Sequence, residues 1–126
     1  SEMCIRDRYI KKTSCLLEAA AMCGAVLAGA DEETVKKTEE YAENLGLAFQ
    51  ITDDILDCTA DEKTLGKPIG SDKKNGKTTF VTLLGLDGAK QKAALLTKKA
   101  EDILNGFSGD TSYLKELTEY LLNRNY

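Results

Sequence analysis

The chain has 126 residues, of which 42% are apolar and 30% charged, and its formal net charge is −4. This size fits one domain, the composition is ordinary for a globular chain, and the charge gives no reason to expect nucleic acid as a partner. The sequence contains no histidine, which excludes histidine metal ligands and histidine-based acid–base or nucleophilic catalysis.

The four cysteines form no Cys-x-x-Cys pair. They are expected to be reduced, mostly buried thiols of a cytoplasmic protein, and not a disulfide framework or a zinc site. No stretch of 18 apolar residues occurs, so no membrane span is expected. Residues 1–8 are polar and lack the apolar centre of a signal peptide. We set them apart as a possible artefact and treat residues 9–126 as one helical domain.

The first predicted helix covers 13–30. It holds a single charge, Glu18, among many alanines and glycines. A helix that is apolar nearly all round is expected in the middle of a bundle. Just before it, Lys12 and Thr13 allow two interpretations. They are either a surface lysine with an N-capping threonine or an anion-binding helix N-terminus.

The second predicted helix starts at the acidic run 31–33, which suits a helix N-terminus, and ends near Asp57. Its buried stripe is expected to consist of Tyr41, Ala42, Leu45, Ala48, Phe49, Thr52 and Leu56. Gly46 lies one turn before the polar end of this helix. Its missing side chain would allow close approach by a substrate or by a neighbouring helix.

One face of this helix is acidic at its C-terminal end. At 100° per residue, Gln50, Asp53, Asp54 and Asp57 fall within an arc of about 100°. Like charges at this spacing repel, and the helix C-terminus disfavours anions. A cation should therefore offset them, and hard oxygen ligands without histidine suit Mg²⁺. The simpler alternative is a solvated acidic face.

Residues 58–75 are polar and rich in helix breakers, which predicts a long loop. The stretch 65–80 contains three glycines, the only proline and four lysines. Glycines let the backbone approach a ligand closely, and lysines supply compact positive charge for phosphate. A carboxylate cluster followed by such a loop fits a metal-bridged diphosphate site.

Three more helices complete an all-α prediction. A short one is expected over 78–84, and a second runs from a cap at Asp87 to about Leu104. The last opens at Asp110 or Ser112, and Arg124 near its end suits the helix dipole. The stripe of this last helix is expected to be Tyr113, Leu114, Leu117, Tyr120 and Leu121.

Two familiar ligand-binding loops do not fit. A nucleotide P-loop would need Gly, four residues and then Gly-Lys-Thr, but five residues lie between Gly70 and Gly76. An EF-hand starting at Asp57 would need glycine where Glu62 stands and glutamate where Pro68 stands.

Several ordered motifs together resemble the C-terminal half of a trans-prenyl diphosphate synthase, most closely the bacterial short-chain farnesyl/geranylgeranyl type. The residues that carry the resemblance are Lys12-Thr13, Phe49-Gln50, Asp53-Asp54-Ile55-Leu56-Asp57, Leu65-Gly66-Lys67, Gly70-Ser71-Asp72 and Gly76-Lys77-Thr78. The likeness spans about 10–126. It implies the helical bundle of the isoprenoid synthases and head-to-tail prenyl transfer from an allylic diphosphate to isopentenyl diphosphate.

The resemblance also implies residue roles. Asp53, Asp54 and Asp57 would hold Mg²⁺ as the second aspartate-rich motif, and helical angle favours Asp53 and Asp57 as direct ligands. The residues implied at the diphosphate are Lys12, Thr13, Gln50, Lys67, Asp72 and Lys77, all but Asp72 also counted as catalytic. The parent protein would be a homodimer.

One departure is large, because the first aspartate-rich motif of the family belongs in an earlier half that this sequence does not supply. The chain is therefore interpreted as a fragment that is inactive alone. The alternative is a helical interaction module that keeps the bundle but performs no chemistry.

Overall fold

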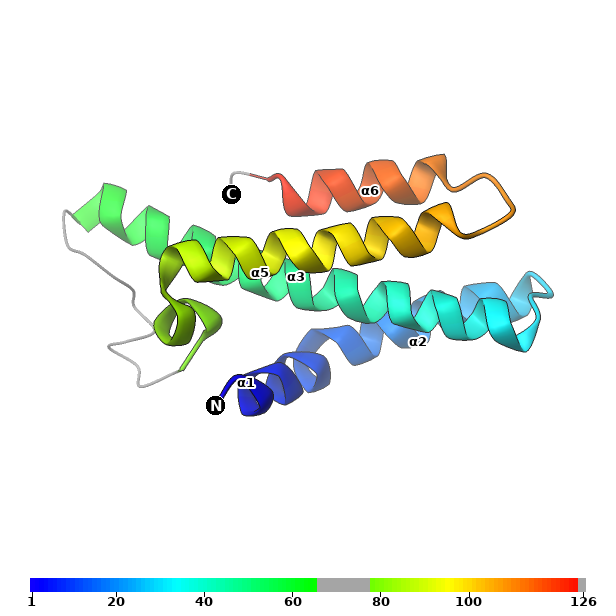
Figure 1. Ribbon diagram of the computed structural model, residues 1–126, viewed down its shortest axis with the longest axis horizontal. Helices are drawn as coiled ribbons and strands as arrows, with labels where there is room; N and C mark the ends of the chain where they lie inside the picture. Colours follow the sequence, from blue (N-terminus) through cyan, green and yellow to red (C-terminus); the bar gives the residue numbers. More distant parts are fainter. Residues whose placement is uncertain (66–77, 125–126) are drawn as a thin grey trace.

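The computed structural model describes residues 1–65 and 78–124, with side chains described for 1–60 and 78–124. Every regular element in these ranges is a helix, which confirms the all-α prediction (Figure 1). In chain order the elements are α1 (Glu2–Tyr9), the π-helix η1 (Ile10–Ser14), α2 (Cys15–Leu27), α3 (Glu32–Leu65), α5 (Phe80–Asn105) and α6 (Ser112–Leu122).

The antiparallel pair of α3 and α5 forms the centre of the fold. Figure 1 shows α6 along one side of this pair and α2 along the other. The main core lies between the two central helices and includes Leu47, Ala48, Ile51, Phe80, Val81, Ala89 and Leu96. A second cluster, near the turn between α5 and α6, contains Tyr41, Leu45, Ala100 and Leu104. The expected stripe of α3 is thus buried over 41–48.

Helix α3 is longer than predicted. It continues to Leu65, so residues 58–65 are helical where the sequence suggested a loop. The physical reason is that this stretch contains good helix formers such as Ala60, Glu62 and Lys63, and the next glycine is residue 66. The carboxylate face therefore lies two turns before the helix end, where the helix dipole has little effect. The rest of the predicted loop, 66–75, lies outside the described residues.

Helix α5 contains the two helices that the sequence predicted. Thr79 caps its start, since its hydroxyl accepts a hydrogen bond from the Thr82 amide at 3.2 Å. Gly85 then adopts φ 76°, ψ 169° and interrupts the helix. That left-handed φ is a conformation that glycine adopts without strain. Asp87, predicted as a cap, lies inside the second segment because Gly85 already provides the break.

Helix α2 does not lie in the middle of the helices that the structure describes, whereas its composition predicts the middle of a bundle. All thirteen of its residues lie in the described part of the chain, and none is buried. Leu16 and Leu27 are 75% and 88% exposed. Three of the four cysteines are exposed as well, so the expectation of mostly buried thiols is wrong. Its main neighbour is α3, on one side. The helix ends at Leu27, three residues earlier than expected, before a turn in which Gly29 has φ 80°.

The prediction of a helix N-terminus at Lys12 and Thr13 is wrong. Both residues lie in η1, which continues α1 and leads into α2 with helical backbone at each junction. Lys12 therefore has no free helix N-terminus beside it. In α6 the predicted stripe is partly wrong, since Tyr113 and Tyr120 are 73% and 62% exposed. The buried residue of α6 is Thr118, whose Oγ1 lies 2.8 Å from the Tyr41 hydroxyl.

Candidate functional site

The polar face of α3 lines a cavity of about 500 Å³. Gln50, Asp53, Asp54 and Asp57 all contribute to its wall, as the helical spacing predicted. The opposite wall consists of Arg8 and Tyr9 of α1, Lys12 of η1 and Thr79, the N-cap residue of α5. The structure thus brings Lys12 to the same cavity as the carboxylates, although the nearest of them, Asp53, is 41 positions away in sequence.

Gln50 and Thr13 connect the two walls directly. The Gln50 Nε2 donates to Thr13 Oγ1 at 2.5 Å, and Gln50 is only 7% exposed. The two helices can approach this closely because Gly46 faces Ser14. A Cβ on Gly46 would lie 2.4 Å from Ser14 Oγ and 2.9 Å from Ser14 Cα. Of the two explanations for Gly46, the contact with a neighbouring helix is therefore the one observed. The π-helical winding of η1 occurs at this contact, and such turns often mark functional sites.

Asp54 accepts a hydrogen bond from the Tyr9 hydroxyl. Tyr9 is buried, and its ring packs edge-to-face on Phe80 with centroids 5.4 Å apart. Burial, and secondarily the Asp54 carboxylate, raise the pKa of Tyr9 far above its ordinary value, so the hydroxyl keeps its proton and acts as a donor. Tyr9 was not among the site residues predicted from the sequence. The available signal was its position one helical turn before Lys12 and Thr13.

Asp53 forms an ion pair with Arg124. The guanidinium carbon of Arg124 lies 3.9 Å from the centroid of the Phe49 ring, and the Arg124 side chain is 7% exposed. This residue was assigned only a favourable effect on the helix dipole. Its contact with the carboxylate face could not be found from spacing, because 71 residues separate Arg124 from Asp53.

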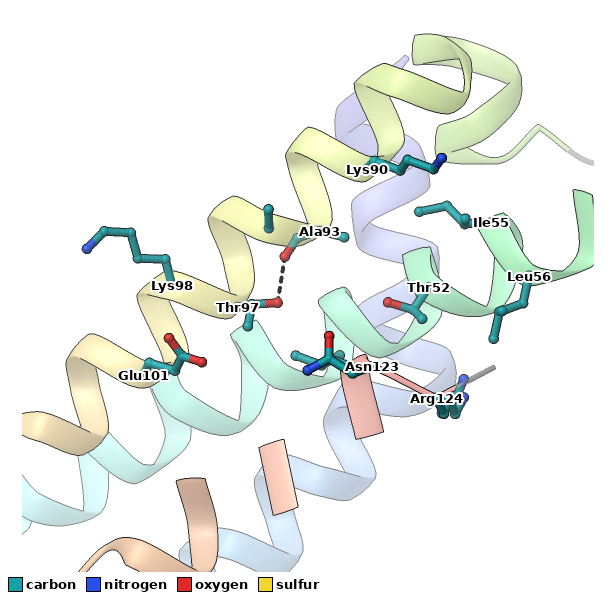
Figure 2. A pocket seen from close by; sticks show the side chains of 12 residues that line it. Thr52, Ile55, Leu56, Lys90, Ala93, Thr97, Lys98, Glu101, Asn123 and Arg124 are labelled. Atoms are coloured by element: carbon teal, nitrogen blue, oxygen red, sulfur yellow. Dashed lines mark hydrogen bonds between the residues drawn. The ribbon is translucent and has the colours of Figure 1, made fainter. Parts of the chain in front are cut away.

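Arg124 also borders a second cavity, of about 490 Å³, between α3, α5 and α6. Figure 2 shows Thr52, Ile55 and Leu56 of α3 facing Lys90, Ala93 and Thr97 of α5. Arg124 lies at the edge nearest the end of α6. The side chain therefore stands between this second cavity and the carboxylate face.

The remaining predicted site residues are placed as follows. Asp57 is exposed at the cavity wall. Lys67, Asp72 and Lys77 lie outside the described residues.

The carboxylate cavity suits a hard divalent cation. Its donors are carboxylate oxygens, which Mg²⁺ prefers. Across 1–60 and 78–124, no three acidic, cysteine or histidine side chains converge closely enough to hold an ion by themselves. Mg²⁺ typically uses only one or two carboxylates and completes its shell with water and substrate phosphates, so the arrangement fits such a shared ion and not a closed protein cage.

The fold and the site define the chain as an all-helical protein whose polar cavity combines carboxylates, an amide and a lysine. The polyprenyl synthetase family model matches residues 4–120, and the chain belongs to this family. The match begins inside the segment 1–8 that was set apart. None of the helices in the described ranges has the length and apolar character needed to cross a membrane.

Relatives and solved structures agree with this membership. Geranylgeranyl pyrophosphate synthase 11, chloroplastic, from Arabidopsis thaliana is 42% identical over 117 residues, covering 92% of this chain and 33% of the relative. Heptaprenyl diphosphate synthase from Staphylococcus aureus superposes with a TM-score of 0.89 at 28% identity, covering all of this chain and 51% of that one. Polyprenyl synthase from Caulobacter crescentus, complexed with calcium and isoprenyl diphosphate, gives 0.83 at 28% identity with the same coverage. The chain thus spans about a third of the length of the curated relatives it matches.

Proposed function

We propose that this chain is the C-terminal part of a Mg²⁺-dependent short-chain prenyl diphosphate synthase. In that reaction the C–O bond of an allylic diphosphate breaks, and pyrophosphate leaves with the electron pair. The allylic cation is attacked by the double bond of isopentenyl diphosphate, which forms the new C–C bond, and a proton is then lost. Family membership and the relatives' names support this reaction class.

The observation that carries the proposal is the shared cavity of Lys12, Gln50 and the three aspartates. Lys12 would neutralise diphosphate oxygens as a point charge. Gln50, held by Thr13, would present its amide in one orientation to the same group. Asp53, Asp54 and Asp57 would supply the metal ligands. When bound, Mg²⁺ would offset the charge that develops on the leaving diphosphate. Lys67, Asp72 and Lys77 are proposed for the same diphosphate from the sequence resemblance alone.

Calorimetric titration of the chain with Mg²⁺ and pyrophosphate tests the site. Binding that requires both ligands, and that Asp53→Ala abolishes, is the expected result. Asp102→Ala is the matched control, because Asp102 is an exposed carboxylate that pairs with Lys98 outside the cavity. Without Mg²⁺, Asp53→Ala should lower the melting temperature only modestly, because Asp53 is 44% exposed, although the change leaves the Arg124 guanidinium without its ion-pair partner. A large loss of stability there would make Asp53 a structural residue.

The chain alone is expected to catalyse no prenyl transfer, because it supplies carboxylates for one side of the leaving group only. Radiolabelled isopentenyl diphosphate with geranyl diphosphate and Mg²⁺ provides the assay. Steady product formation that Asp53→Ala abolishes would show that the chain is sufficient. A cytoplasmic location and a homodimeric parent complete the proposal.

The second candidate is a helical interaction module without chemistry. This candidate is favoured by the exposure of α2, because the helix is strongly apolar and has no buried residue along its described length. Its exposed side chains would suit a protein partner. The same titration separates the candidates, since a module would bind neither Mg²⁺ nor pyrophosphate at the α3 cavity.

A further inference from the structure

Arg124 is fixed in place by two contacts of different kinds. Its guanidinium pairs with Asp53 Oδ1 and also lies over the Phe49 ring, 3.9 Å from the centroid. Phe49 precedes Asp53 by one helical turn, so both partners come from the same side of α3. Only 7% of the Arg124 side chain is exposed, against 44% for Asp53. The arginine is therefore the anchored member of the pair.

The stacking contact should hold Arg124 in place when a cation binds Asp53. A guanidinium stacks on an aromatic face through its planar charge, and this attraction does not depend on the carboxylate. The ion pair involves Oδ1. A carboxylate has two oxygens, so Oδ2 can serve a cation in the adjoining cavity while Oδ1 serves the guanidinium.

Carboxylates that bind metals are commonly held by a second hydrogen-bond donor, which fixes their orientation before the ion arrives. Arg124 meets this description, since it is charged, planar, buried and in contact with a carboxylate that lines the cavity. A lysine at the same place would offer a point charge without the fixed donor geometry.

We propose that Arg124 is a positioning residue of the cation site, which orients Asp53 from behind and makes the end of α6 part of that site. This inference rests on the proposed function, because it assumes that Asp53 is a cation ligand. The inference predicts the sign of the change in metal affinity. If Arg124 orients Asp53, removing Arg124 should weaken cation binding. If Arg124 only competed with the metal ion for Asp53, removing it should strengthen binding.

Mn²⁺ is a suitable probe, because it replaces Mg²⁺ at oxygen sites and broadens nearby amide signals in ¹⁵N NMR spectra of the 126-residue chain. The titration is carried out with pyrophosphate present at a fixed concentration, and it compares wild type with Arg124→Gln, Arg124→Lys and Asp53→Asn. Lys37→Gln is the control. It removes the same charge from the other end of α3, where Lys37 pairs with Glu33. Melting curves without metal accompany each titration.

Arg124→Gln should raise the Mn²⁺ dissociation constant about 10-fold or more, the usual effect of losing a residue that orients a metal ligand. Arg124→Lys should lie between wild type and Arg124→Gln, and Lys37→Gln should match wild type. If Arg124→Gln unfolds the chain, Phe49→Leu is the substitute variant. It removes the stacking contact, leaves both charges in place, and should weaken Mn²⁺ binding in the same direction.

The possible failures are distinguishable. Equal or tighter Mn²⁺ binding by Arg124→Gln overturns the positioning role and leaves the proposed function standing. Equal binding by Asp53→Asn places the ion elsewhere and overturns the role as well. Wild type that binds no Mn²⁺ near Asp53 overturns the cation site itself, and the proposed function with it.

Discussion

Helices α2 and α3 pack against each other and yet use their side chains in opposite ways. The more apolar of the two, α2, has no buried residue in its fully described length, and its Leu27 is 88% exposed. Helix α3 is rich in charges but contributes Leu47, Ala48 and Ile51 to the main core. The difference shows that an apolar sequence indicates that a helix could be buried, but does not show that it is buried. Burial depends on which other helices pack against it.

The largest expected effect comes from truncating the core side of α3. Ile51 is fully buried, so Ile51→Ala should lower the free energy of unfolding by about 2–5 kcal/mol. The matched change in α2, Leu27→Ala, should stay within about 0.5 kcal/mol of wild type. Urea unfolding followed by circular dichroism measures both. Similar losses for the two variants would mean that α2 is packed in solution.

Glycine substitutions sharpen the same contrast. Gly46→Ala places a Cβ 2.9 Å from the Ser14 backbone, which should cost about 1–3 kcal/mol of stability. Gly24→Ala in α2 meets no described atom within 4 Å and should stabilise the chain by about 0.5–1 kcal/mol. The signs should therefore differ between the two helices. Stabilisation by Gly46→Ala would show that the close contact of α3 with η1 relaxes in solution.

The contact of α3 with α6 should have a smaller effect. Tyr41→Phe removes the buried hydrogen bond to Thr118 and should cost about 1 kcal/mol. Tyr113→Phe, on the exposed side of α6, should leave stability unchanged within error. Thermal melts of both variants provide the test, and an equal effect of the two would contradict the observed orientation of α6.

The smallest effect concerns Glu18, the one charge in α2. Burial, followed by the carboxylates of Glu43 and Glu39, raises the pKa of Glu18 in the folded chain. A raised pKa means that the folded state loses stability as pH increases from the ordinary glutamate pKa, about 4.3, through the folded value. Glu18→Gln should therefore raise the melting temperature at pH 7 and make little difference at pH 4. Glu116→Gln, on the exposed side of α6, is the control. A gain that persists unchanged at pH 4 would assign the effect to packing.

The sequence predicted features that depend on local spacing. The helices, the break before residue 86 and the shared face of Gln50 and the aspartates all follow from periodicity and from breakers. The far end of α3 was misjudged because polar residues suggested a loop, although they are good helix formers.

Contacts between distant segments had no local signal. Neither the Arg124 ion pair with Asp53 nor the Tyr9 hydrogen bond to Asp54 follows from spacing within one helix. The rotation of α6 depends on Tyr41, whose hydroxyl reaches Thr118 and leaves Tyr113 outside. Such pairs are determined by how helices pack, which periodicity does not specify.

The tight contact at Gly46 also gives α3 a pivot. The helix is 34 residues long and continuous, and Asp57 lies eleven residues, or about 16 Å, beyond Gly46. A tilt of only about 5° at the pivot would shift the Asp57 end of this lever by about 1.4 Å. If these carboxylates share one small ion, as proposed, they tolerate little displacement of this size. The distance between the backbones at Gly46 and Ser14 therefore determines the position of the Asp57 carboxylate, three helical turns away.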